Sequence, residues 1–92
     1  MSRESKETFK YFNLLVSDGD YMDILMRKHA LEQSRERGIS INEIKETINK
    51  GAKFLQDDKI VSVYRHIKVV FKKINNVFFV ITVMIRKEKN GK

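Results

Sequence analysis

The stretch HALEQSRERGISINEIKETINKG, residues 29–51, decides the fold of this chain because it contains two helix signals separated by a single glycine. Gly38 follows Arg35 and Arg37, which predicts that a first helix, opened by His29, ends at this point. Glycine readily adopts the left-handed backbone that often follows a helix, and basic residues in the last turn complement the negative end of the helix dipole. A second helix is expected almost at once.

Four residues predict where the second helix begins. Ser40 and Glu43 have the spacing of a capping box, in which each side chain accepts a hydrogen bond from the backbone amide of the other residue. Ile39 and Ile44 stand at the two positions of a hydrophobic staple. Apolar residues then recur every three or four positions up to Gly51, which predicts one buried face and the helix end.

A strand is predicted immediately before these helices, over residues 21–27. Met22, Ile24 and Met26 alternate with other side chains, which is the period of a half-buried strand. A single helix over residues 21–37 is the competing interpretation, because Met, Leu, Lys and Arg are good helix formers. Periodicity leaves both alternatives open.

The first twenty residues are interpreted as an N-terminal extension. Residues 17–20 read Ser-Asp-Gly-Asp, which is a turn signal, whereas residues 9–16 fit a strand or a short helix equally well. We therefore divide the chain into an extension, residues 1–20, and a single domain, residues 21–92.

After Gly51 the composition changes to β-branched and aromatic residues, which favour strands. The predicted strands are 52–56, 60–65, 67–74 and 77–86. Turns are expected at residues 57–59 and at Asn75-Asn76, since Asn and Asp tolerate turn conformations.

The Asn75-Asn76 turn predicts the register of the last two strands by pairing Ile74 with Val77. The opposed pairs would then be Phe71 with Val80, Val70 with Ile81, and Val69 with Thr82. The last strand is apolar on both faces, which predicts a central position with helices on one face. The N-terminal segment or a partner protein is expected to cover the other face.

The predicted fold class is α+β, with two short helices packed on an antiparallel sheet in the order β-α-α-β-β-β-β. A length of 92 residues with 41% hydrophobic and 34% charged side chains fits one soluble globular domain. The chain has no cysteine, which excludes disulfides and thiolate metal sites, and we expect neither a metal site nor a cofactor. No run of apolar residues approaches the roughly 20 needed for a membrane helix, and no secretory signal is visible, so we expect a cytoplasmic location.

The charge of the chain is distributed unevenly. Residues 1–51 contain equal numbers of basic and acidic residues, so the net charge of +7 belongs to the strand-rich part that follows. A surface that binds a polyanion such as RNA requires this distribution, although a basic sheet edge without a ligand has the same composition.

Several segments resemble a small prokaryotic family known as domain of unknown function 4258. They are His29-Ala30, Glu36 to Ser40 and Ile81 to Val83, and the resemblance covers about residues 21–86. It implies a fold like that of the RelE and BrnT-like toxins, compact α+β domains of which several cleave messenger RNA. At position 33 the family pattern implies a basic residue, but this chain has Gln33, which weakens the transfer of a phosphate contact to that position.

Metal-independent RNA cleavage needs a base for the 2′-hydroxyl, cations for the phosphate charge and an acid for the leaving oxygen. We propose Tyr64 and His66 as catalytic residues, with Arg65 and Lys68 as phosphate contacts; in a regular strand Tyr64, His66 and Lys68 would share one face. The non-functional alternative is a solvent-exposed strand edge, since lysines commonly protect edge strands from pairing with other chains.

His29 is the third candidate catalytic residue, because helix starts attract anions and imidazole can transfer protons. Packing at the corner between strand and helix is the structural alternative. Further phosphate contacts are predicted for Arg35, Arg37, Lys72 and Arg86, for which solvated surface charges are the alternative.

The preferred hypothesis is an RNA-binding toxin-like domain that acts as a metal-independent endoribonuclease, with an antitoxin-like protein as partner. The alternative is a non-catalytic interaction module or homodimer that uses the two-faced apolar last strand.

Overall fold

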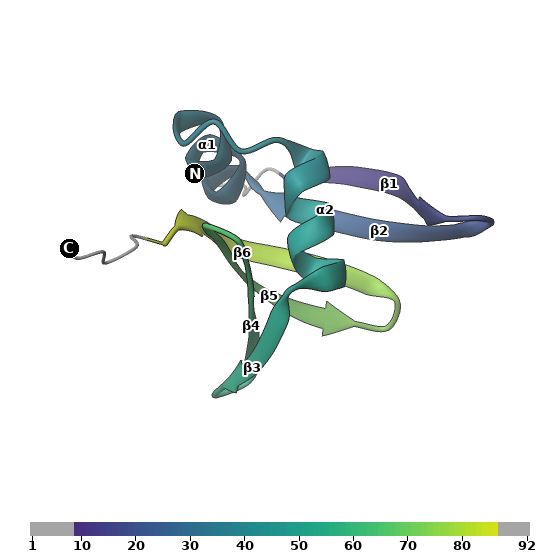
Figure 1. Cartoon of the computed structure of the whole chain (residues 1–92). Helices are drawn as coiled ribbons and strands as arrows, with labels where there is room; N and C mark the ends of the chain where they lie inside the picture. Colours follow the sequence, from purple (N-terminus) through teal and green to yellow (C-terminus); the bar gives the residue numbers. More distant parts are fainter. Residues whose placement is uncertain (1–8, 87–92) are drawn as a thin grey trace, which may run out of the picture.

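The protein is an α+β domain in which two helices lie on one face of a six-stranded sheet (Figure 1). The computed structural model describes residues 9–86; residues 1–8 of the predicted extension and the last six residues of the chain lie outside that range. The strands are β1 (Phe9–Ser17), β2 (Asp20–Arg27), β3 (Ala52–Gln56), β4 (Lys59–Tyr64), β5 (Ile67–Ile74) and β6 (Val77–Ile85), and the helices are α1 (Lys28–Glu36) and α2 (Ile41–Lys50). No helix of the described residues is long and apolar enough to cross a membrane.

The sheet has the strand order β1-β2-β6-β5-β4-β3. The prediction of a strand over residues 21–27 is confirmed, so the continuous helix over residues 21–37 is wrong. The alternative left open for residues 9–16 resolves to a strand, and β1 pairs with β2 along its length. The expected fully antiparallel sheet is wrong in one place, because β2 and β6 run parallel.

The parallel pair follows from the route of the chain. The two helices carry the chain from β2 to the far edge at β3, and the β3–β6 meander then brings it back beside β2. The prediction that the last strand is central is confirmed, since β6 lies between β2 and β5.

The predicted register of β5 and β6 is correct near the turn and wrong beyond it. Ile74 pairs with Val77 and Phe71 with Val80, as expected. A β-bulge then shifts the pairing, so that Val70 lies opposite Thr82 instead of Ile81, and Val69 lies opposite Val83. A bulge inserts one extra residue in one strand, and the alternation of side chains does not reveal it.

Both predicted helix boundaries between α1 and α2 are confirmed. Gly38 has a φ of 67°, and the backbone amides of Gly38 and Ile39 donate to the carbonyls of Arg35 and Ser34, which forms a Schellman motif. At the start of α2 the Ser40 hydroxyl accepts from the Glu43 amide at 3.1 Å, and the Glu43 carboxylate accepts from the Ser40 amide at 2.9 Å.

Gly51 ends α2 as predicted, but for a different reason. Its φ of −72° suits any residue, so no left-handed backbone is required. A Cβ atom at this position would lie 2.5 Å from the Ser62 hydroxyl oxygen and 2.5 Å from the Thr47 carbonyl oxygen. Glycine is therefore required by the close approach of α2 to β4, which the buried hydrogen bond from Ser62 to Thr47 fixes.

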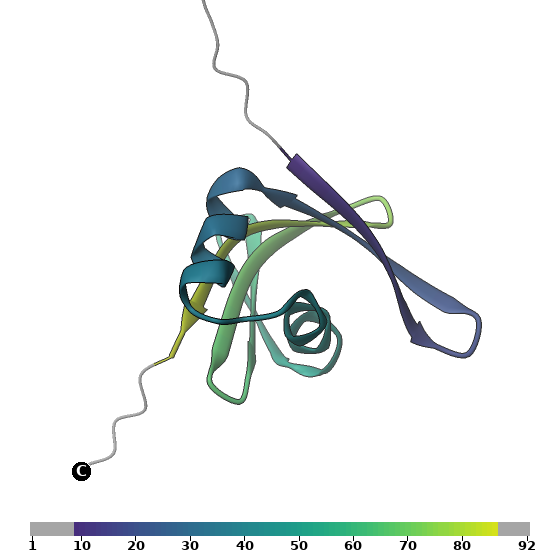
Figure 2. The ribbon, with the colours of Figure 1, turned by 90° about the horizontal axis from the view of Figure 1, so that it is seen from above.

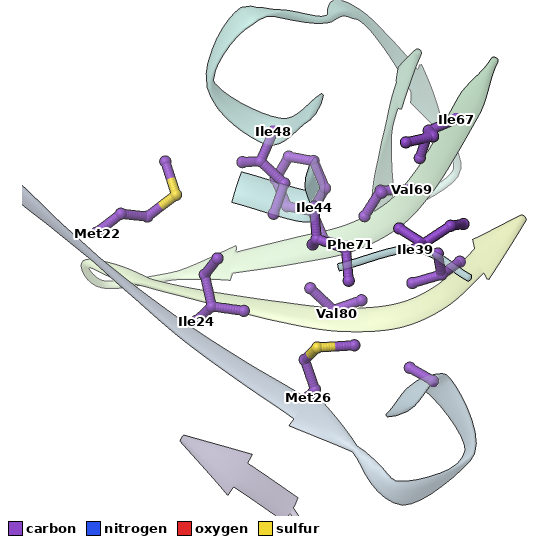
Figure 3. Packing of buried hydrophobic residues seen from close by; sticks show 12 residues of the cluster. Met22, Ile24, Met26, Ile39, Ile44, Ile48, Ile67, Val69, Phe71 and Val80 are labelled. Atoms are coloured by element: carbon purple, nitrogen blue, oxygen red, sulfur yellow. The ribbon is translucent and has the colours of Figure 1, made fainter. Parts of the chain in front are cut away.

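The hydrophobic core lies between the helices and the face of the sheet that they cover (Figure 3). Alternate residues of β2 point into it, as do one face of α2 and the staple residue Ile39. The fully buried side chains include Phe71, Ile24, Met26, Ile44, Ile48, Val69, Val80 and Val83. Seen from above, the sheet curves around the two helices (Figure 2).

The opposite face of the sheet is covered by no helix of the described residues, and we call it the open face. Strand pairing and the contacts of its side chains place there the exposed apolar residues Phe9, Tyr11, Leu15, Tyr21, Phe54 and Ile74. We expected the N-terminal segment or a partner protein to cover this face of the last strand. The described part of the N-terminal segment does not cover it, because β1 adds to the edge of the sheet.

Candidate functional site

The candidate site is built around the tight turn between β4 and β5. Tyr64 is the last residue of β4 and pairs with Ile67, so that Arg65 and His66 form a two-residue turn. Arg65 has a φ of 58°, the left-handed conformation that favoured hairpin turns require of their first residue. A non-glycine residue adopts it at a cost of about 1–2 kcal/mol, so the backbone at Arg65 is strained at the tip of the turn.

A small hollow of about 40 Å³ joins this turn to helix α2. Its lining consists of Tyr64, Arg65, His66 and Ile67 from the sheet, and Glu43 and Glu46 from the helix. Glu43 is already engaged in the capping box. Glu46 is partly buried and lies one helical turn after Glu43, on the side of α2 that faces the β4–β5 turn.

Two arginines supply positive charge at this turn. The guanidinium of Arg65 lies over the Tyr64 ring, 5.2 Å from its centre. Arg86 donates its backbone amide to the His66 carbonyl at 2.8 Å, and its guanidinium Nη1 lies 3.5 Å from the Arg65 carbonyl oxygen. The cations thus lie at the same turn as the imidazole and the phenol.

The expectation that Tyr64, His66 and Lys68 share one face is wrong. Tyr64 and Ile67 are paired on the helix face, and His66 belongs to the turn instead of a strand. Lys68 is the next residue after Ile67 and pairs with Val63, so its side chain lies on the open face. The turn interrupts the alternation on which the expectation rested.

The other predicted phosphate contacts are scattered. Lys72 pairs with Asp58 at 3.2 Å, and Arg37 pairs with Glu36 at 3.7 Å while donating to the Gln33 carbonyl. Arg35 is exposed in the last turn of α1. The structure therefore gathers only Arg65 and Arg86 from the predicted set at the β4–β5 turn.

His29 lies in the first turn of α1 and is exposed, as expected for a residue at a helix start. Gln33 lies one turn after His29 on α1 and accepts a hydrogen bond from the Val83 amide at 3.2 Å. Three residues beyond Val83, the Arg86 amide donates to the His66 carbonyl. No contact within residues 9–86 brings His29 and His66 together. The same hydrogen bond gives Gln33 a structural role, since β2 pairs with β6 only as far as Val80.

Sequence reasoning missed Glu46. The signal that it offered was weak, because a glutamate on the polar side of an amphipathic helix is usually a solvated charge. Only the packing of α2 against the β4–β5 turn brings its carboxyl group to the hollow that His66 lines.

Two carboxylates of the sheet, Asp58 and Asp23, have perturbed pKa values. The ammonium of Lys72 holds the pKa of Asp58 below its ordinary value, chiefly through a hydrogen bond. Hydrogen bonds from Tyr11 at 2.7 Å and Asn13 at 2.6 Å lower the pKa of Asp23, and the same contact raises the pKa of Tyr11. Both carboxylates are thereby committed to structural partners on the sheet.

Within residues 9–86 no group of three or more His, Asp or Glu side chains is placed to hold a metal ion. The chemistry available at the β4–β5 turn is proton transfer by carboxylate, imidazole and phenol groups, together with charge stabilisation by guanidinium groups.

A comparison with protein families shows what the chain is similar to. A family model described as a domain of unknown function, DUF4258, matches residues 26–85, which extend from the end of β2 to the end of β6. Neither the curated proteins nor the solved structures contain a match to this chain. The matched segment covers more than half of the sequence and includes the β4–β5 turn and α2. The chain therefore belongs to the family of the domain of unknown function DUF4258.

Proposed function

We propose that this protein binds RNA at the β4–β5 turn and cleaves it as a metal-independent endoribonuclease. The observation that supports this function is the hollow that combines Glu46, His66 and Tyr64 with Arg65, next to Arg86. These residues provide a base, an acid and cations, which are the three requirements of metal-independent phosphodiester cleavage.

The roles follow from the chemistry of each group. The Glu46 carboxylate accepts the proton of the 2′-hydroxyl, and the resulting oxygen attacks the adjacent phosphorus. His66, protonated, gives its proton to the leaving 5′-oxygen, so that the products are a 2′,3′-cyclic phosphate and a 5′-hydroxyl. Arg65 and Arg86 stabilise the charge on the phosphate oxygens, and Tyr64 orients the phosphate through its phenol.

Four of the remaining predicted residues act, in this proposal, on the RNA backbone away from the bond that breaks. His29 and Arg35 are exposed on α1 and contribute phosphate contacts. Lys72 and Arg37 contribute less, because they already have acidic neighbours. The resemblance to RelE and BrnT-like toxins supports a toxin role in the cytoplasm, with an antitoxin-like protein as partner.

Cleavage of single-stranded RNA in the presence of a chelator tests the activity. The purified protein is expected to release cyclic-phosphate products, with a bell-shaped pH profile since one group must be ionised and the other protonated. His66→Ala and Glu46→Gln should each lower kcat about 10²- to 10⁴-fold, the usual contribution of an acid or base. Glu32→Gln is the matched control and should keep full activity, since within residues 9–86 this carboxylate of α1 pairs with Lys28.

His29→Ala separates the two histidines. It should raise KM while leaving kcat within about threefold, because a lost phosphate contact weakens binding without removing a proton donor. The proposed endoribonuclease activity would be refuted if the purified protein did not cleave RNA and its expression caused no growth arrest. Full activity of Glu46→Gln would remove that residue from the mechanism and leave the turn residues alone.

A non-catalytic interaction module or homodimer is the second candidate, and the open face of the sheet specifically favours it. Light scattering and salt-dependent RNA binding distinguish the two functions. A salt-sensitive complex of one protein molecule with RNA supports the first, whereas a tight dimer that does not bind RNA supports the second.

A further inference from the structure

The open face has a composition that solvent exposure does not explain. A sheet that packs helices on one side only usually presents polar residues on the other. Here Val61 and Val70 of the central strands are buried on that face, and Val63 and Phe79 beside them are partly exposed, in addition to the exposed apolar residues named above. Phe9 packs on Phe79 with ring centres 5.4 Å apart. Exposed apolar surface of this extent marks an interaction site.

Two separate hollows lie on the open face. The first, of about 400 Å³, lies near the β5–β6 turn and is lined by Phe9, Leu25, Ile74, Asn75, Val77 and Phe79. The second, of about 420 Å³, lies toward the β4–β5 turn and is lined by Ala52, Phe54, Val61, Val63, Lys68 and Arg86. The first has no charged residue in its lining, whereas the second has two basic ones.

The charges of the open face are unbalanced. Asp58 is engaged by Lys72 and Lys59, and Asp23 accepts hydrogen bonds from Tyr11 and Asn13. Lys68 and Arg86 have no acidic partner within residues 9–86. The part of the face around the second hollow therefore presents positive charge to whatever covers it.

We propose that the open face is the docking surface for an acidic amphipathic helix of another protein, with apolar anchors in both hollows and carboxylates over Lys68 and Arg86. A second copy of this chain is disfavoured as the occupant because both copies carry a net charge of +7. RNA is disfavoured because the first hollow offers no cation to a phosphate. The proposal holds whether or not the protein cleaves RNA.

The dimensions suit a helix. Neighbouring strands of the six-stranded sheet are about 4.8 Å apart, and each residue extends a strand by about 3.3 Å. The open face therefore measures roughly 600 Å², which is of the order of the 800 Å² that one partner of a stable complex buries. The hollows are separated by about four residues along the strands and two to three strands across, or roughly 18 Å. This is the length of about 12 helical residues, so anchors about three turns apart reach both hollows.

Three synthetic helical peptides test this surface. They share one stripe of Leu and Phe with anchors about three turns apart, and their polar positions carry Glu, Gln or Lys. Calorimetry should show the Glu peptide binding at least tenfold more tightly than the Lys peptide. Amide shifts in NMR spectra should concentrate on the residues that line the two hollows. Lys68→Glu should weaken binding of the Glu peptide at least tenfold while leaving the affinity for the Gln peptide within threefold.

Two neighbouring residues of β3 provide a matched pair of variants. Phe54 lies on the open face and is 56% exposed, whereas Leu55 lies on the other face and is 80% exposed. Phe54→Thr should weaken the Glu peptide at least tenfold, and Leu55→Thr should not change its affinity. Threonine suits a strand, and dispersed amide spectra of both variants show that they fold.

Several results would overturn the proposal. Equal affinity for the Glu and Lys peptides would exclude an acidic partner. Equal effects of the two β3 variants on peptide binding would exclude the open face as the docking surface. Sedimentation that shows a dimer broken by Phe54→Thr would make a second copy the occupant. Displacement of the Glu peptide by single-stranded RNA, with RNA binding lost in Phe54→Thr, would make the face a nucleic-acid surface.

Discussion

The two faces of the sheet differ in how their apolar side chains are used. On the helix face Phe71 is 1% exposed and packs beneath α2, whereas on the open face Phe54 remains 56% exposed. Both faces are rich in apolar residues, so hydrophobicity alone does not distinguish a core from a docking surface. The difference depends on which face the two helices cover, and the predictions below test it in order of expected effect.

The largest effect is expected on the helix face. Phe71→Ala removes a fully buried ring and should lower the free energy of unfolding by about 3–5 kcal/mol, because a cavity is left in addition to the lost burial. Phe54→Ala should lower it by less than about 1 kcal/mol, since much of the ring is already in water. Urea denaturation of both variants measures the contrast, and a similar loss for the two would show that the open face is part of the core.

Gly51→Ala tests how closely the helix layer approaches the sheet. The added methyl group would lie 2.5 Å from the Ser62 hydroxyl oxygen and from the Thr47 carbonyl oxygen, and backbone atoms cannot move aside easily. We expect a loss of about 1–3 kcal/mol by overpacking. Thermal unfolding of Gly51→Ala next to Ala52→Gly, a change at an exposed neighbour, checks this, and an unchanged midpoint for Gly51→Ala would contradict the observed contact.

Ser40→Ala removes the capping box at the start of α2, the helix that covers the sheet next to the candidate site. The Glu43 amide would lose its acceptor, which should lower stability by about 1 kcal/mol. Circular dichroism during thermal unfolding measures the effect. Ser40→Asp should retain most of the stability because aspartate also caps helices, and equal losses for both variants would point to a different role for Ser40.

The smallest effect is expected for the ion pair of the open face. The folded pKa of Asp58 is lowered, so its contact with Lys72 stabilises the protein above the ordinary carboxyl pKa of about 4 and is lost as the pH falls through the folded value. Asp58→Asn should therefore lower the unfolding temperature slightly at pH 7, with a difference that shrinks below pH 4. Combining it with Lys72→Met should add no further loss, whereas additive losses would mean that the two residues act independently.

The candidate site was only partly predictable from the sequence. Tyr64, Arg65 and His66 are consecutive in the sequence, so their closeness to one another could be predicted without knowledge of the fold. Glu46 was missed because it lies eighteen positions before Tyr64, in a different element. Lys68 was placed on the wrong face because a two-residue turn interrupts the alternation of side chains. The first error arises from tertiary packing in the middle of α2, and the second arises at the turn where β4 ends and β5 begins.

Local chemistry in the sequence determined the helix boundaries at Gly38 and Ser40, the turn at Asn75 and the presence of the strands. These features depend on hydrogen bonds and backbone preferences within a few residues, which the sequence contains directly. The tertiary structure alone decided the parallel pairing of β2 with β6, the bulge in β6, the close approach at Gly51 and the face that the helices leave open. Those features depend on which distant surfaces pack together, and that choice is set by the free energy of the whole core.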